Sequence, residues 1–343
     1  MNADHGLGLP VINYPTHFPL LRQLHISASA DLVDWVNRQI RLDQAQLPYL
    51  REFYFDGGNV ISPQNRVFDL PFGCLTRLSM DVFPSIDDCY TVIRNCQAAT
   101  DLSIGIGTLL FPHPPTTTNL INDIFLPNLQ SFHIKSHGGI SSFFDHFVFP
   151  HLLHLRIQLQ WDIFEEDAED GYLISDYPAW PQMTVSTFFR RSSCHITSLR
   201  LDQINLTFSD MMELLSIAGE FLEIIHISSF QAIMAEYSSM CCVDDNVLEC
   251  LTWNDLDPLR TCPRLSHITL DWCVSCTPGL WSHMIKSCMV SDHNNFLPLV
   301  RVHITTCDYG SLVDEFSDLV GMCIKGLDLA LFDDLCEPVL LTM

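Results

Sequence analysis

Basic residues are scarce in this 343-residue chain. Its 17 lysines and arginines stand against 41 aspartates and glutamates, which gives a formal net charge of −24 at pH 7. Proteins that bind nucleic acid need a basic face to neutralise phosphates. The charge balance therefore argues against a nucleic-acid partner and favours a basic partner, or simply solubility.

The chain also lacks long apolar runs and an export signal. No stretch approaches the ~18 consecutive apolar residues of a membrane-spanning helix. Residues 1–17 do not combine a basic stretch with an apolar core, as a signal peptide would. Fourteen cysteines without an export signal favour free thiols in a reducing compartment. We therefore expect an intracellular protein, cytoplasmic or nuclear, with no membrane contact.

Motifs of catalysis are missing as well. The sequence has no glycine-rich phosphate loop, no Gly-x-Ser-x-Gly elbow and no His-Glu-x-x-His helix. His146, His151 and His154 cluster around an expected strand, but no serine or cysteine is placed as an obvious nucleophile. We expect a binding protein rather than an enzyme, and no cofactor.

What the chain does contain is one short phrase that occurs eleven times. Each phrase is an apolar residue, two of any kind, an apolar residue, one of any kind and an apolar residue. Apolar residues two apart are typical of a short strand, and this phrase is that of leucine-rich repeats. The central apolar positions are Leu24, Phe53, Leu78, Leu102, Phe132, Leu155, Leu199, Ile225, Ile268, Val302 and Leu327.

Prolines and helical patterns between the phrases support the same interpretation. Proline fixes φ and cannot donate to a strand ladder, so it should introduce each strand. Apolar spacing predicts helices over residues 31–40, 209–218 and 278–288. The prolines that precede seven of the phrases are Pro19, Pro48, Pro71, Pro127, Pro150, Pro263 and Pro298.

These features predict one α/β leucine-rich-repeat solenoid of about eleven repeats. In this horseshoe a parallel sheet lies inside and helices lie outside. We expect a lead-in over residues 1–17 and the repeat domain over 18–343, with an acidic insertion near 160–190.

The cysteines and histidines of the C-terminal part allow two interpretations. One is a metal site, with ligands from the set Cys262, His267, Cys273, Cys276, His283 and Cys288. The favoured one is structural, because leucine-rich repeats place an Asn or Cys three residues after the last strand leucine, where it ties adjacent turns together. Cys273 follows Leu270 by three, and Cys307 follows Ile304 by three.

The concave face is the expected binding surface, because residues between the last two apolar positions of each phrase point away from the core. Polar and charged residues fill this row and the next one. From the two rows we select as candidate partner-binding residues His25, Tyr54, His133, Lys135, Arg156, Arg200, Asp202, His226, Asp271 and His303. The eleventh phrase places Asp328 in the first of these rows and Ala330 in the second.

Histidine is over-represented in the first of these rows. Four of its eleven residues are histidines, although the whole chain has only 15 in 343. Either histidine merely tolerates half-exposed strand positions, or it titrates in the binding surface. In the second case partner binding should change between roughly pH 5.5 and 7.5, around the unperturbed pKa of histidine.

The phrases and their proline openings resemble the leucine-rich-repeat region of fungal F-box proteins. The resemblance covers about residues 18 to 343 and is carried by residues 193–201 (SCHITSLRL) and 261–270 (TCPRLSHITL). It implies that the repeats select a protein substrate, while an N-terminal F-box docks the Skp-type adaptor of a cullin–RING ubiquitin ligase. An F-box is longer than the 17 residues before the first phrase, so we expect the ligase-docking half to be absent from this chain.

The sequence thus favours a protein–protein interaction scaffold, most specifically the substrate-recognition module of an F-box-type receptor that lacks its F-box. The alternative is an acidic leucine-rich-repeat inhibitor that clamps a basic enzyme. Steep salt dependence of binding would favour the inhibitor, because a highly acidic clamp relies on charge that salt screens.

Overall fold

The computed structural model describes most of the repeat region. The described residues are 18–28, 42–43, 45, 47–57, 68–83, 86–107, 123–136, 140, 143–159, 180–229, 242–253, 261–289, 297–305, 316–323 and 326–332. The lead-in over 1–17 and the expected helix over 31–40 lie outside them. Within the described part, no helix is both long and apolar enough to cross a membrane.

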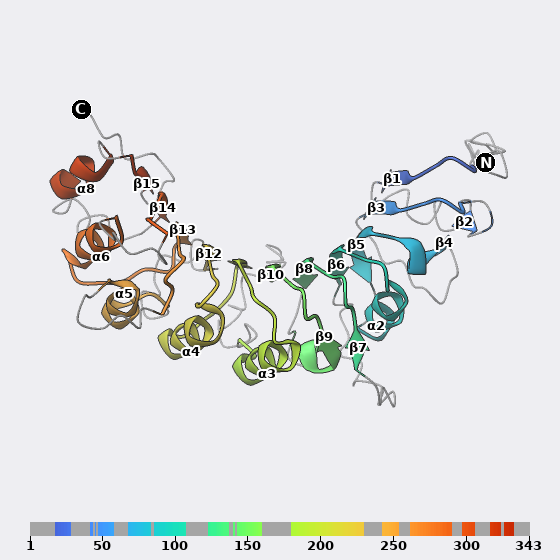
Figure 1. Cartoon of the computed structure of the whole chain (residues 1–343), viewed down its shortest axis with the longest axis horizontal. Helices are drawn as coiled ribbons and strands as arrows, with labels where there is room; N and C mark the ends of the chain where they lie inside the picture. Colours follow the sequence, from blue (N-terminus) through green and yellow to red (C-terminus); the bar gives the residue numbers. More distant parts are fainter. Residues whose placement is uncertain are drawn as a thin grey trace, which may run out of the picture.

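Eleven strands form one parallel sheet in which every strand pairs with its neighbours in the sequence of repeats. This sheet lines the inner side of an open arc (Figure 1), so the predicted α/β horseshoe with a parallel inner sheet is confirmed. Its strands are β1 (Gln23–Ala28), β3 (Glu52–Gly57), β5 (Arg77–Phe83), β6 (Asp101–Ile106), β8 (Ser131–Ser136), β10 (His154–Leu159), β11 (Ser198–Asp202), β12 (Ile224–Ser228), β13 (His267–Asp271), β14 (Arg301–Thr305) and β15 (Asp328–Phe332).

The outer side of the arc carries helices and two small sheets (Figure 1). The helices are α2 (Ile86–Asn95), α3 (Gln182–Ser192), α4 (Phe208–Ala218), α5 (Asp245–Leu251), α6 (Leu280–Met289) and α8 (Phe316–Cys323), with short 3-10 turns η3 (Phe72–Cys74) and η4 (Phe143–His146). The small sheets pair β2 (Leu42–Asp43) with β4 (Phe68–Asp69) and β7 (Ile124–Phe125) with β9 (Phe147–Val148).

Two of the three expected helices are confirmed. The expected helix over 209–218 is α4, which begins one residue earlier, because Thr207 is its N-cap and forms a capping box with Asp210. The expected helix over 278–288 is α6, which begins at Leu280. The interval near 160–190 is described from residue 180 onward, where α3 follows Pro181.

The prolines act at turns that precede the strands. In four repeats the amide of the first phrase leucine donates to the carbonyl three residues earlier, with proline at the second turn position, as β-turns prefer. These turns are Phe18–Leu21, Leu47–Leu50, Phe149–Leu152 and Cys262–Leu265, with N···O distances of 3.2 to 3.3 Å. The fixed φ of proline therefore sets the chain direction as each strand begins.

A backbone ladder joins the repeats just before the strands. At nine of the ten junctions one carbonyl accepts hydrogen bonds from two successive amides of the next repeat, whereas the carbonyl of Val300 accepts from Asp328 alone; for example, the carbonyl of Arg22 accepts from Arg51 and Glu52 at 2.8 and 3.0 Å. The same double acceptance recurs at the carbonyls of Arg51, Thr76, Thr100, Gln130, Leu153, Thr197, Glu223 and Ser266. This ladder keeps neighbouring phrases in register whatever their side chains.

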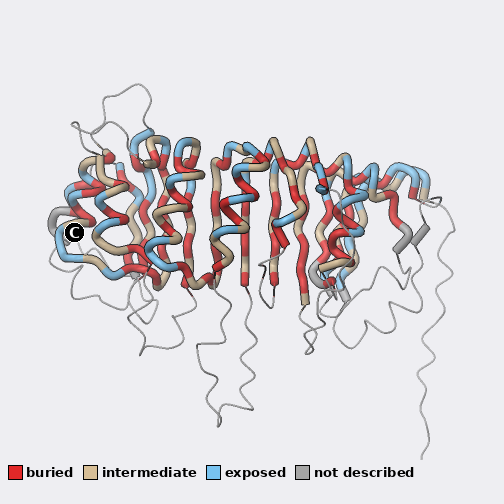
Figure 2. The backbone as a smooth tube through the Cα atoms, turned by 90° about the horizontal axis from the view of Figure 1, so that it is seen from below, coloured by how far each residue is buried: buried red, intermediate tan, exposed pale blue. Residues whose placement is uncertain are grey.

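The core lies between the sheet and the outer layer. Along the strands, buried residues alternate with half-buried ones (Figure 2), as a two-residue period requires. At the middle of the arc the core is aromatic: Phe132 of β8 packs against Phe143, Phe144, Phe147 and Phe149, with ring centroids 5.3 to 6.5 Å apart. The η4 turn thus fills the space that a longer helix occupies in other repeats.

The predicted register is confirmed for the first ten phrases and is wrong for the eleventh. Strand pairing aligns Val302 with Leu329, not with Leu327. Gly326 adopts a φ of +103° between α8 and the strand, and a strand cannot continue through that left-handed conformation. The strand therefore starts after the glycine, and Ala330 rather than Asp328 stands beside His303.

Candidate functional site

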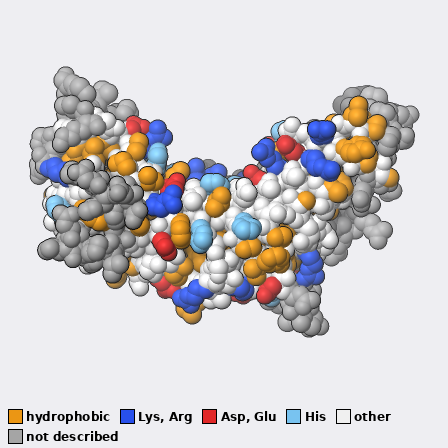
Figure 3. Space-filling model, viewed as in Figure 1, with side chains coloured by type: hydrophobic (Ala, Val, Ile, Leu, Met, Phe, Trp, Pro, Cys, Tyr) orange, Lys and Arg blue, Asp and Glu red, His pale blue; other side chains and the backbone are white. Residues whose placement is uncertain are grey.

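Three rows of side chains line the concave face, because alternate residues of each strand point to the same side of the sheet. The middle row joins His25, Tyr54, Ser79, Ser103, His133, Arg156, Arg200, His226, Thr269, His303 and Ala330. This middle row is the histidine-rich row of the sequence analysis. The row on its amino side contains Glu52, and the row on its carboxyl side contains Lys135 and Asp202. In the space-filling view the arc is hollowed on this side, with basic and histidine side chains along the hollow (Figure 3).

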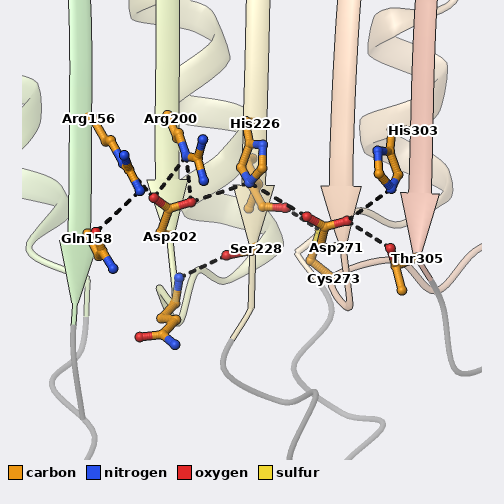
Figure 4. Close-up of polar contacts among 12 residues, drawn as sticks. Arg156, Gln158, Arg200, Asp202, His226, Ser228, Asp271, Cys273, His303 and Thr305 are labelled. Carbon is orange, nitrogen blue, oxygen red and sulfur yellow. Dashed lines mark hydrogen bonds and ion pairs between the residues drawn. The ribbon is translucent and has the colours of Figure 1, made fainter. Parts of the chain in front are cut away.

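Asp202 is the centre of a polar network on strands β10 to β14 (Figure 4). Its carboxylate accepts hydrogen bonds at 2.8 Å from the Nε atoms of Arg156 and Arg200, which lie on adjacent strands. The Nε2 atom of His226 is 3.3 Å away, on the other side. With a side chain only 8% exposed, Asp202 is held by donors from three strands.

Asp271 continues the network toward the C-terminal end of the arc. It accepts a hydrogen bond of 2.9 Å from Oγ1 of Thr305. Nε2 of His226 is 3.6 Å from one carboxylate oxygen, and Nε2 of His303 is 4.0 Å from the other. His226 therefore lies between two carboxylates, so six of the predicted binding residues form one connected group.

The donors around Asp202 determine its ionisation. Burial alone would raise the pKa of Asp202, but hydrogen bonds from His226, Arg200 and Arg156 outweigh it and hold the pKa well below its ordinary value. The ionised form of Asp202 is therefore more favourable in the folded state than in the unfolded state. This contribution to stability is present above the unfolded pKa and is lost as the pH falls toward the folded pKa.

We expect Asp202→Asn to lower the free energy of unfolding at pH 7 by about 2–3 kcal/mol, less than for a fully buried ion pair because both arginines are partly exposed. The difference from the wild type should shrink below about pH 4, where the unfolded-state carboxyl protonates. Urea unfolding at pH 7, 5 and 3.5, followed by circular dichroism, measures it.

Asp328→Asn is the matched control, since Asp328 pairs with Arg301 at 2.6 Å but both side chains are 58% exposed. We expect this variant to change stability by less than about 1 kcal/mol at each pH. A difference for Asp202→Asn that is equal at pH 7 and 3.5 would contradict the assigned ionisation.

The amino-terminal end of the face holds a separate group. The ring of His25 meets the ring of Tyr54 edge-on, with centroids 6.0 Å apart. The Tyr54 hydroxyl donates to Glu52 at 3.1 Å, and Arg77 lies 3.9 Å from the same carboxylate. The structure thus places His25 and Tyr54 together, five and four strands away from Arg156 along the sheet order.

His133 is a histidine of the middle row for which the structure does not favour titration near neutral pH. Its Nδ1 atom is 3.0 Å from Oγ of Ser103, and its Nε2 atom has no hydrogen-bond partner among the described residues. Burial, with a smaller effect of Arg156, lowers the pKa of His133 to about 4. The imidazole therefore stays neutral from pH 5.5 to 7.5, and it cannot contribute to the predicted pH dependence. Because so weak a base activates a hydroxyl poorly, the Ser103 pair supports no catalytic assignment.

Charge on the concave face differs from that of the whole chain. Among the described side chains of the three rows, five are basic and six are acidic. The basic ones are Arg77, Lys135, Arg156, Arg200 and Arg301, and the acidic ones are Glu52, Asp56, Asp101, Asp202, Asp271 and Asp328. The large acidic excess of the protein therefore lies mostly outside this face.

The buried cysteines of the C-terminal part serve the core and the turns. Cys262, Cys273 and Cys288 are completely buried. The thiol of Cys273 points to the carbonyl of Ile227 in the preceding repeat, at 3.7 Å, which confirms the predicted tie between turns. Within the described ranges no group of three or more His, Cys, Asp or Glu residues is arranged to hold a metal ion, and the described cysteines are free thiols. Cys307 lies outside the described residues.

Sequence reasoning did not select Glu52 and Arg77, which lie beside Tyr54 outside the two predicted rows, nor four further residues that the structure places in these contacts. Gln158 accepts from Nη2 of Arg156 at 3.3 Å, and Oγ of Ser228 accepts from the backbone amide of Gln203 at 3.1 Å. Ser103 and Thr305 hold His133 and Asp271. All four lie in the two predicted rows, so row membership was the available signal, whereas pairing across strands was not.

Comparison of the sequence with protein-family models and with curated proteins finds no match to this chain.

Proposed function

We propose that the chain binds a protein through its concave face, as the substrate-recognition module of an F-box-type ubiquitin-ligase receptor. The observation that carries the recognition role is the continuous polar face over eleven parallel strands, with a network that fixes its charged side chains in advance. Side chains that are already ordered lose less entropy when a partner binds. The concave side is also where solenoid proteins commonly bind.

The ligase part of the proposal rests on the resemblance of the repeated phrases to the repeat region of fungal F-box proteins. In such a receptor the repeats select the substrate and a Skp-type adaptor links it to the cullin. In this proposal the concave face of the chain is the surface that selects the substrate. The adaptor contact is therefore the part to test separately.

The near balance of charge on the face bears on the alternative, an acidic inhibitor of a basic enzyme. A clamp held by bulk charge needs an acidic contact surface, whereas this face holds five basic and six acidic side chains. Paired charges give selectivity more than raw attraction. The balance favours selective recognition over the inhibitor.

The test uses the full chain as bait in its own cell extract, with bound proteins identified by mass spectrometry. One variant carries Tyr54→Ala and His303→Ala, at opposite ends of the face. The matched control carries Phe208→Ala and His283→Ala, an exposed aromatic residue and an exposed histidine on outer helices. We expect the concave variant to lose at least about tenfold in affinity for the recovered partner, as for truncated interface anchors, and the control to bind normally.

Equal binding by all three baits would overturn the concave face as the recognition surface. A purified Skp-type adaptor is then tested directly against the wild-type chain and the two variants. Adaptor binding that survives both double substitutions supports the ligase role. Partner binding without adaptor or cullin would contradict that role and leave protein recognition in place.

A further inference from the structure

Two arginines lie directly opposite each other at the centre of the concave face. Arg156 of β10 and Arg200 of β11 are register partners, and each bonds through Nε to the single carboxylate of Asp202. Like charges opposite each other on neighbouring strands are destabilising. One guanidinium already matches the single negative charge of Asp202, and His226 adds a further contact at 3.3 Å, so neutralising the buried carboxylate does not require the second arginine.

The centre of the face is therefore locally cationic in a protein of net charge −24. Across β8, β10, β11 and β12 the three rows hold three basic side chains and one carboxylate, a balance of two positive charges with histidines neutral. The basic side chains are Lys135, Arg156 and Arg200. This excess is local, because Asp101 and Asp271 follow on either side.

The donors of this centre are available to a ligand. Arg156 and Arg200 are 36% and 44% exposed. Within the described part of the chain, both Nη atoms of Arg200 and Nη1 of Arg156 have no hydrogen-bond partner, and Lys135 makes no hydrogen bond or ion pair. Because Asp202 fixes each guanidinium through Nε, the remaining N–H groups are oriented before any ligand arrives.

We propose that Arg156, Arg200 and Lys135 form an oxyanion-binding site for an acidic or phosphorylated side chain of the protein partner. Guanidinium N–H groups match the oxygens of carboxylate and phosphate in pairs, and an ammonium adds a point charge. The single carboxylate of Asp202 leaves positive charge unmatched at this centre, and an oxyanion of the ligand would match it. This assignment rests on the proposed recognition role of the concave face and names the chemistry that its centre selects.

The first experiment measures small probes on the full chain, by NMR of arginine Nε–H groups labelled with ¹⁵N. The probes are inorganic phosphate and a blocked tetraglutamate peptide. We expect saturable shifts of the Arg156 and Arg200 signals with dissociation constants of about 1–10 mM, typical of one or two charge-assisted contacts. Affinity for phosphate about tenfold above that for the peptide would indicate a phosphorylated side chain as the ligand, and comparable affinities would indicate a carboxylate.

Variants separate this site from a purely structural ion network. Arg200→Gln should weaken probe binding at least about tenfold, the equivalent of one lost charge-assisted hydrogen bond. Arg200→Lys keeps the charge and should also weaken binding, because it lacks the planar fork, while the protein stays folded. Arg190→Gln is the control, since Arg190 lies on α3 and its side chain is 64% exposed. The site would be overturned if the wild type showed no saturable shifts, or if the Arg156 signal of Arg200→Gln shifted with the same dissociation constant as in the wild type.

The second experiment uses the recovered protein partner and distinguishes the two proposals. If Tyr54→Ala with His303→Ala abolishes partner binding but Arg200→Gln does not change it, the oxyanion site is wrong and the recognition surface stands. If neither variant changes partner binding, the concave face itself is wrong. Loss of binding with Arg200→Gln, but not with Arg190→Gln, supports the site in its natural role.

Discussion

Replacing Gly219 by alanine is expected to destabilise the protein by about 3 kcal/mol or more, at the upper end of the cost of overpacking. Gly219 closes α4 with an ordinary φ of −66°, so backbone conformation is not the reason. An added Cβ would overlap the carbonyl oxygens of Leu215 and Thr261 and lie 2.8 Å from Sγ of Cys262. Two of these three neighbours are backbone atoms: moving the Leu215 carbonyl would distort the last turn of α4, and moving the Thr261 carbonyl would separate α4 from the next repeat. Urea unfolding followed by circular dichroism measures the loss.

Gly321→Ala is the matched control, because Gly321 is exposed within α8 and a Cβ there meets nothing within 4 Å. We expect this variant to stabilise the protein by about 0.5–1 kcal/mol through helix propensity. Equal stabilities of Gly219→Ala and the wild type would show that α4 can move away from residues 261–262 at little cost.

Phe132→Ala is expected to lower the free energy of unfolding by about 3–5 kcal/mol. Phe132 is 1% exposed, and its ring meets four phenylalanine rings contributed by the segment around η4. Since these four rings are themselves packed against one another and against Phe188 of α3, they have little freedom to move into the cavity. The midpoint of urea unfolding should fall with an unchanged slope.

Phe125→Ala removes the same side chain from β7, where it is 51% exposed. We expect it to change stability by less than about 1 kcal/mol, because little apolar area is lost from the core. A similar loss for both variants would mean that the aromatic cluster is loosely packed.

Much of the fold could be predicted from the sequence, because the same apolar spacing recurs in every repeat and a proline precedes seven of the eleven phrases. The eleventh register failed for a physical reason: Leu327, Leu329 and Leu331 offer two overlapping pairs of apolar strand positions, and the left-handed conformation of Gly326 decides between them. The helices α2, α3, α5 and α8 were not predicted. Of these, α5 and α8 have only 7 and 8 residues, which give little helical period to detect.

The sequence could predict which residues lie in the rows of the concave face, but it could not predict which of them contact one another. Alternation along the strands correctly put Arg156, Arg200 and Asp202 on the concave face. Which of them share hydrogen bonds depends on side-chain conformations across strands that are 44 residues apart at their centres. The pKa of His133 depends on burial by its neighbours, so four histidines in one row could not be told apart by sequence.

The doubly accepting carbonyls before the strands have an evolutionary consequence. They join successive repeats through main-chain carbonyls and through amides that every residue except proline supplies, so the nine junctions that share this pattern are chemically interchangeable. Duplication or deletion of a whole repeat would preserve this connection, and its side chains could diverge afterwards. The length of the arc, and with it the width of a target that it can span, is therefore open to change one repeat at a time.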